Sequence, residues 1–74
     1  MKITYDPVAD AAIIHLGGEI EADGAPRSVM CDLDVPDGAV ILLLSGDEQL
    51  VGMEVLGASR LLPTHVIDSA ERAS

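Results

Sequence analysis

The alternation of polar and apolar residues along the chain predicts several short β-strands. Residues 2–5 and 11–16 place apolar side chains at every second position, which is the period of a strand with one buried face. The short link at 6–10 begins with Asp-Pro, so we expect these segments to pair as antiparallel strands. Alternation resumes over residues 28–35, which we predict to be a third strand, and the Pro-Asp-Gly sequence at 36–38 favours a turn.

The clearest predicted element is a β-hairpin over residues 40–56. Residues 40–44 are all β-branched or leucine, and we expect this strand to be covered on both faces. A polar four-residue link at 45–48 leads to the return strand at 49–56, which carries one charged residue, Glu54.

The remaining segments predict a loop and a helical C-terminus. Residues 17–26 hold three glycines, a proline and three acids, and favour an exposed, mobile loop. Residues 58–62 favour one helical turn with Ser59 as N-cap, and residues 64–73 favour a short helix laid on the sheet. The pattern therefore predicts one β-rich α+β domain over residues 1–74, an antiparallel meander of four to five strands with a short C-terminal helix and frayed last residues.

The composition leaves few ways to stabilise so small a domain. Of 74 residues 49% are hydrophobic, but Tyr5 is the only aromatic residue and Cys31 the only cysteine, which excludes an intramolecular disulfide. A chain of this length buries only roughly 60% of the surface that its unfolded form exposes. Because the Cys and His content offers no structural metal site either, we expect the chain to self-associate as a homodimer.

The charge excludes one class of partner. Thirteen acidic against four basic residues give a net charge of −9, whereas nucleic-acid binding depends on basic side chains that neutralise phosphates. A basic protein partner or loosely held cations suit this surface better. The longest apolar run, residues 39–44, is far shorter than the roughly 20 residues of a membrane span, and the first residues lack a signal-peptide pattern. We therefore expect no membrane contact and a cytoplasmic location.

Three carboxylates are weak candidates for a functional site. Asp6 and Asp10 flank the first turn, where they can bind a cation, act as an acid–base pair, or simply cap the turn. Glu54 can contact a partner, or it can be an exposed charge on an edge strand that prevents uncontrolled strand pairing. Gly52 beside it indicates a close backbone approach or a bulge.

The other polar residues form no catalytic constellation. Three acids near the second turn lack the ligand pattern of a calcium site: Asp32, Asp34 and Asp37. His15 and His65 are far apart in the sequence, and Cys31 lies on the apolar side of its strand, where we predict a small core residue. We expect no catalytic residue, no metal or cofactor, and no enzymatic activity.

Two motifs resemble those of the YuzE-like family, a group of small bacterial proteins that is numbered 2283 among the domains of unknown function. They are KITYDP at 2–7 with ADA at 9–11, and LVGMEVL at 50–56 with AS at 58–59. The resemblance covers residues 2–62 and implies an antiparallel sheet with a terminal helical segment, without any catalytic residue. For some members it also implies pairing with toxin-like proteins.

This chain differs from the family pattern in ways that add apolar surface. Leu43-Leu44-Ser45 stands where members tend to have acidic and aromatic residues, and Ala12-Ile13 replaces a bulkier pair. We therefore hypothesise a non-catalytic module that self-associates through its hairpin. The candidate interface is Val40, Leu42, Leu43, Leu44, Val51, Met53 and Val55. Two alternatives stay open: an antitoxin-like or regulatory partner of a basic protein, and small-ligand or cation binding by surface carboxylates.

Overall fold

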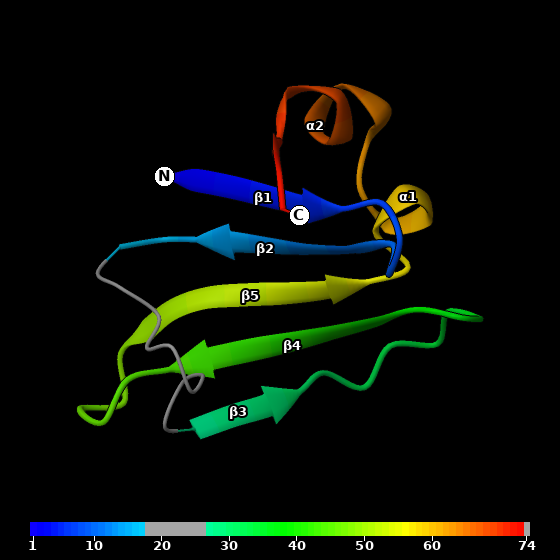
Figure 1. The fold of residues 1–74 in the computed structure, drawn as a ribbon. Coiled ribbons are helices and arrows are strands. Elements are labelled where there is room, and N and C mark those ends of the chain that lie inside the picture. Colours follow the sequence, from blue (N-terminus) through cyan, green and yellow to red (C-terminus); the bar gives the residue numbers. More distant parts are fainter. Residues whose placement is uncertain (18–26, 74) are drawn as a thin grey trace.

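The computed structural model describes residues 1–17 and 27–73, which form one six-stranded sheet and two short helices (Figure 1). The elements are β1 (Lys2–Asp6), β2 (Ala11–His15), β3 (Arg27–Met30), β4 (Ala39–Leu44), β5 (Leu50–Leu56), α1 (Ala58–Leu61), α2 (Thr64–Ser69) and β6 (Glu71–Arg72). The predicted β-rich α+β class is confirmed, with six strands where four to five were expected. The loop predicted at 17–26 lies, apart from Gly17, outside the described residues.

Two antiparallel units joined side by side make up most of the sheet, whose strand order is β3-β4-β5-β2-β1-β6. β1 and β2 form a hairpin in which Tyr5 pairs with Ala12, and β3, β4 and β5 form a meander in which Val40 pairs with Val55. Val55 also pairs with Ala12, so β5 joins the meander to the hairpin. β6 runs parallel to β1, which makes the sheet mixed rather than purely antiparallel. The predicted hairpin of β4 and β5 is confirmed.

The third strand is shorter than predicted. β3 ends at Met30, whereas alternation indicated a strand over residues 28–35. The amide of Cys31 still donates to the carbonyl oxygen of Val40 (2.8 Å), but β4 begins only one residue before Val40, at Ala39. After Cys31, residues 32–35 have no neighbouring strand within the described part of the chain. An alternating sequence without a strand to pair with does not form a strand.

The helix predicted for residues 64–73 is also shorter, and the chain after it forms a strand. α2 ends at Ser69, whose hydroxyl donates back to the carbonyl oxygen of His65 (2.9 Å), and the next residue is already extended. Glu71 and Arg72 then pair with β1, because a strand edge offers backbone partners that the end of a short exposed helix lacks. Neither described helix has the length and apolar character needed to cross a membrane.

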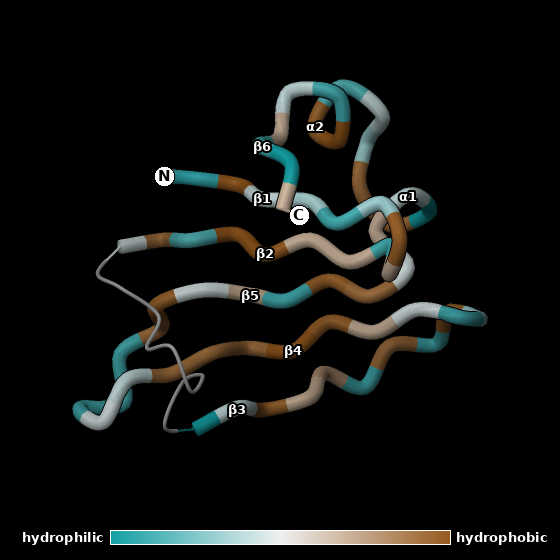
Figure 2. Tube along the Cα trace, in the orientation of Figure 1, coloured by the Kyte–Doolittle hydropathy of each residue, from teal (hydrophilic) through white to brown (hydrophobic). Residues whose placement is uncertain are grey.

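The helices cover only part of one sheet face. The core beneath them consists of Tyr5, Ala12, Val55 and Ala58. Half-buried apolar side chains surround this core: Ile14, Val40, Leu61, Leu62, Ile67 and Ala70. β4 is hydrophobic along most of its length (Figure 2), yet Leu43 is its only buried residue. The expected cover on both faces of this strand is therefore incomplete in the described residues.

The strand register divides the side chains between two faces. On the face that carries the helices, a second apolar row runs across five strands beside the core: Ile3, Ile14, Met53, Leu42 and Val29. Successive residues of a strand point to opposite sides of the sheet. The row between these two therefore lies on the other side: Thr4, Ile13, Glu54, Ile41 and Met30. We call these sides the helix face and the opposite face.

Candidate functional site

Asp10 connects the β1–β2 turn to the start of α1. Its Oδ1 accepts hydrogen bonds from the Tyr5 hydroxyl (2.8 Å) and the Ser59 amide (2.9 Å). Its Oδ2 accepts one from the Ser59 hydroxyl (2.8 Å), and its backbone carbonyl accepts the amide of Ala58 (3.0 Å). The first two amides of α1 have no partner within the helix, so a residue 49 positions before Ser59 caps them.

The predicted N-cap of α1 is therefore wrong. Ser59 is the second residue of the helix, and Gly57 occupies the N-cap position without a side-chain hydrogen bond. Gly57 has a φ of 70°, and a Cβ there would lie 2.5 Å from the carbonyl oxygen of Asp37, so this close approach requires glycine. Arg60 adds an ion pair with Asp37 (3.5 Å). The junction thus also holds the β3–β4 turn against α1.

Hydrogen bonds set the direction of two pKa shifts at this junction. The donors on Tyr5 and Ser59 lower the pKa of Asp10, because they stabilise the carboxylate. The same bond raises the pKa of Tyr5, because it stabilises the protonated phenol. The Arg72 guanidinium lies over the Tyr5 ring, 5.2 Å from its centroid. One carboxylate therefore ties β1 to α1, both of its oxygens accept from donors of the same chain, and Tyr5 in turn contacts Arg72 of β6.

The sequence did not predict the partners of Asp10. Tyr5 and Ser59 lie 5 and 49 residues from it, and neither spacing belongs to a local pattern of secondary structure. All three residues fall within the family-like motifs, which is the one signal that could have linked them.

Asp6 serves the turn itself. Its Oδ1 accepts hydrogen bonds from the amides of Val8 (2.9 Å) and Ala9 (3.4 Å), so the turn-capping interpretation of this residue is confirmed. Asp6 and Asp10 thus bind separate sets of donors, which is the geometry of two caps rather than of an acid–base pair.

Glu54 lies in the middle of the sheet. β5 pairs with β4 on one side and with β2 on the other, so the interpretation of Glu54 as an edge charge is wrong. Its half-buried side chain belongs to the opposite face, between the cross-strand neighbours Ile13 and Ile41. Gly52, two residues before it, is buried in the sheet.

The remaining polar candidates do not converge. Exposed carboxylates follow β3: Asp32, Asp34 and Asp37. His15 lies 3.4 Å from the Thr4 hydroxyl, and His65 is exposed on α2. Cys31 was predicted to be a core residue, but its side chain is only half-buried. Within residues 1–17 and 27–73, no three His, Cys, Asp or Glu side chains come together to hold a metal ion.

The candidate interface residues divide between the two faces. Two belong to the core or contact it: Val40 and Val55. Three share the helix face but lie outside that core cluster: Leu42, Val51 and Met53. Leu43 points to the opposite face, and Leu44 pairs with Leu50 after a register shift. The hairpin as a whole is therefore not one surface.

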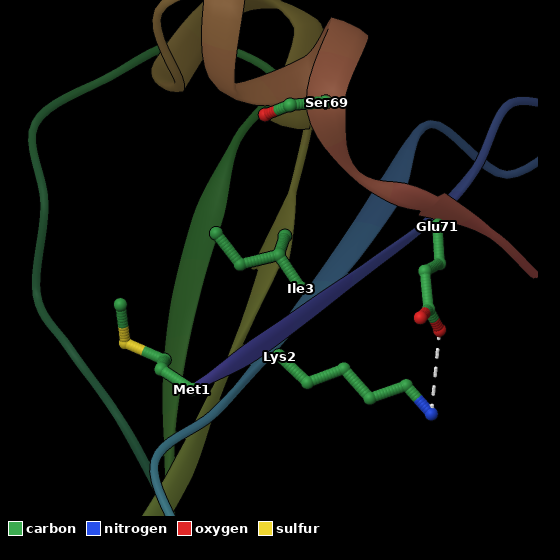
Figure 3. Close-up of a pocket in the computed structure, with 5 residues that line it drawn as sticks. All are labelled: Met1, Lys2, Ile3, Ser69 and Glu71. Atoms are coloured by element: carbon green, nitrogen blue, oxygen red, sulfur yellow. Dashed lines mark ion pairs between the residues drawn. The ribbon is translucent and has the colours of Figure 1, made fainter.

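Two shallow hollows open at the surface of the described residues. The first, of about 310 Å³, is lined by Met1, Lys2, Ile3, Ser69 and Glu71 (Figure 3). Ile3 points to the side of Ser69, whereas Lys2 and Glu71 form an ion pair (3.4 Å) on the other side of β1. The second, of about 540 Å³, is lined by Leu16, Gly17, Gln49, Leu50 and Val51. Each joins segments far apart in the sequence, so neither was predicted.

Residues 2–59 match the model of the family described as Protein of unknown function (DUF2283). The match begins with β1 and ends at Ser59, so it includes Asp10 and both of its side-chain partners. No curated protein and no solved structure shows a significant match. Since the family model covers most of the chain, the chain belongs to this family of proteins of unknown function.

Proposed function

We propose that this protein is a non-catalytic interaction module that self-associates through apolar residues of its β-hairpin. One observation carries the proposal: 49% of the chain is hydrophobic, but only five hydrophobic residues of the described part are buried. Apolar surface that a chain cannot bury by itself favours association, because its transfer out of water is worth about 25 cal/mol per Å².

The hydrogen bonding of the carboxylates supports a role without catalysis. Asp6 binds two amides of its own turn, and Asp10 binds three donors on Tyr5 and Ser59. A general acid or base needs a free lone pair or proton directed at a substrate, whereas these groups hold the backbone in place.

A second candidate, a partner of a basic protein, is supported by the ion pairs. Each of the four basic side chains already has a partner in the chain: Lys2 with Glu71, Arg27 with Glu48, Arg60 with Asp37, and Arg72 with the Tyr5 ring. The acidic residues that remain give the surface its net charge of −9, and a basic protein would complement it.

Sedimentation velocity of the purified chain tests the main proposal. Over a micromolar concentration series, we expect a species of twice the 7.7 kDa chain mass. A monomer throughout that series contradicts self-association. A monomer that instead forms a stoichiometric, salt-sensitive complex with a small basic protein supports the second candidate.

A further inference from the structure

We infer that the second copy binds the part of the helix face that α1 and α2 leave uncovered. This surface, the distal patch, consists of Ile3, Leu16, Val29, Leu42, Val51 and Met53. The inference rests on the proposed self-association and goes beyond the hairpin, because Ile3 lies in β1, Val29 in β3, and Leu16 directly after β2. Val40 and Val55 are not part of the distal patch, because Val55 belongs to the protomer's own core and Val40 packs against it.

The register makes the distal patch one continuous surface. Met53, Leu42 and Val29 lie side by side on β5, β4 and β3. Ile14 of β2, an apolar residue that also packs against the core, lies between Met53 and Ile3 in the same row. Leu16 donates its amide to the carbonyl oxygen of Val51 (3.0 Å), which places these two residues at the next row. Leu16 and Val29 are exposed, at 39% and 38%, and the other four residues are half-buried. The patch is therefore apolar throughout and accessible within the part of the chain that the structure describes.

The position of Glu54 favours the distal patch over the opposite face as the interface. The central row of the opposite face contains the Glu54 carboxylate, flanked by Ile13 and Ile41. Two copies that met there would have to desolvate one carboxylate each and bring like charges together, which costs several kcal/mol unless each finds a partner. The distal patch carries no charge, so two copies can meet there without this cost.

The absence of charge on the distal patch favours a second copy as the occupant. A basic protein would be attracted to carboxylates, and this patch has none, whereas a second copy related by two-fold symmetry brings the same apolar surface against it. The net charge of −9 makes two copies repel each other elsewhere, so they can meet only at an uncharged, apolar surface. The second hollow borders the patch at Leu16 and Val51 and offers space for apolar side chains of the partner.

Two neighbouring residues of β3 provide a matched test. Val29 and Met30 are both exposed, at 38% and 67%, but they point to the helix face and the opposite face respectively. Val29→Glu should raise the dimer dissociation constant by at least about tenfold, since it places a carboxylate in the apolar interface. Met30→Glu should leave it unchanged within about twofold. Sedimentation measures both variants, and circular dichroism confirms that each is folded.

The outcomes separate this inference from the proposed function. A wild-type dimer that Met30→Glu dissociates and Val29→Glu does not would place the interface on the opposite face and overturn the inference, while self-association holds. A wild-type monomer would overturn both. If Val29→Glu does not fold, Leu16→Glu at the other end of the patch gives the same reading: loss of the dimer supports the inference, and an intact dimer contradicts it.

Discussion

A single carboxylate, that of Asp10, holds the first turn of the chain to its first helix. Its three side-chain hydrogen bonds reach Tyr5 in β1 and Ser59 in α1, so its ionisation is coupled to the contact between these elements. The Asp6 cap, in contrast, involves only its own turn. This difference explains why the sequence predicted the role of Asp6 and not that of Asp10: a turn cap is a local pattern, whereas the Ser59 contact exists only once the sheet has formed.

We predict that Asp10→Asn lowers the free energy of unfolding at neutral pH, because the neutral amide keeps one acceptor oxygen but loses the negative charge that strengthens the hydrogen bonds from Tyr5 and Ser59. The pKa of Asp10 is lower in the folded state than its unfolded value of about 3.9. The carboxylate therefore stabilises the fold above that pH, and the contribution is lost as the pH falls through the folded pKa. The difference between wild type and variant should shrink in acid, which urea unfolding at neutral and acidic pH measures.

Asp47→Asn, an exposed carboxylate in the β4–β5 turn, is the matched control and should change stability by less than about 0.5 kcal/mol at either pH. All unfolding curves need the same protein concentration, so that self-association does not enter the comparison. An Asp10→Asn effect that is equally large in acid would show that the ionised form contributes nothing.

The C-terminal segment of α2 and β6 lies on the sheet as a strap. Its polar contacts are exposed: the Lys2–Glu71 ion pair has side chains 57% and 67% accessible. Ile67 and Ala70, in contrast, are half-buried against the core. The family match ends at Ser59, so the strap lies beyond the matched region. Besides the backbone pairing of β6 with β1, its attachment therefore depends on a few apolar side chains.

We predict that Ile67→Ala lowers the free energy of unfolding by about 1–2 kcal/mol, roughly half the usual cost at a fully buried site. Glu71→Gln, which removes only the exposed ion pair, should cost less than about 0.5 kcal/mol. Urea unfolding of both variants measures the two effects. If Glu71→Gln costs more than Ile67→Ala, the ion pair rather than apolar contact holds the strap.

Among the strands, the sequence predicted correctly those features that depend on neighbouring residues. It failed for those that depend on pairing with strands far away in the sequence. The hairpin of β4 and β5 follows from two apolar runs and a polar turn, and it is correct. The third strand was too long because the end of β4, not the alternation of residues 28–35, sets where β3 stops. Glu54 was misplaced for the same reason, since only the pairing of β5 with β2 makes its strand central.

The whole molecule is broad and thin, with principal extents of 33 × 27 × 18 Å. One sheet with two short helices on part of one face leaves much of its apolar surface accessible, and the buried core has no disulfide to support it. The sequence predicted this shortage from length and composition alone. It could not predict which surface remains open, because that depends on where α1 and α2 come to lie.

If a second copy covers that surface, stability must depend on protein concentration. Unfolding of a dimer into two chains is favoured by dilution, so the melting temperature should rise as the chain is concentrated. With an unfolding enthalpy of roughly 0.7 kcal/mol per residue, the rise for a dimer of this chain is about 5 °C for each tenfold increase in concentration. Circular dichroism melts over a concentration series measure it. Val29→Glu should lose this dependence while Met30→Glu keeps it, and a wild-type melting temperature that is independent of concentration would mean that the exposed apolar surface belongs to a stable monomer.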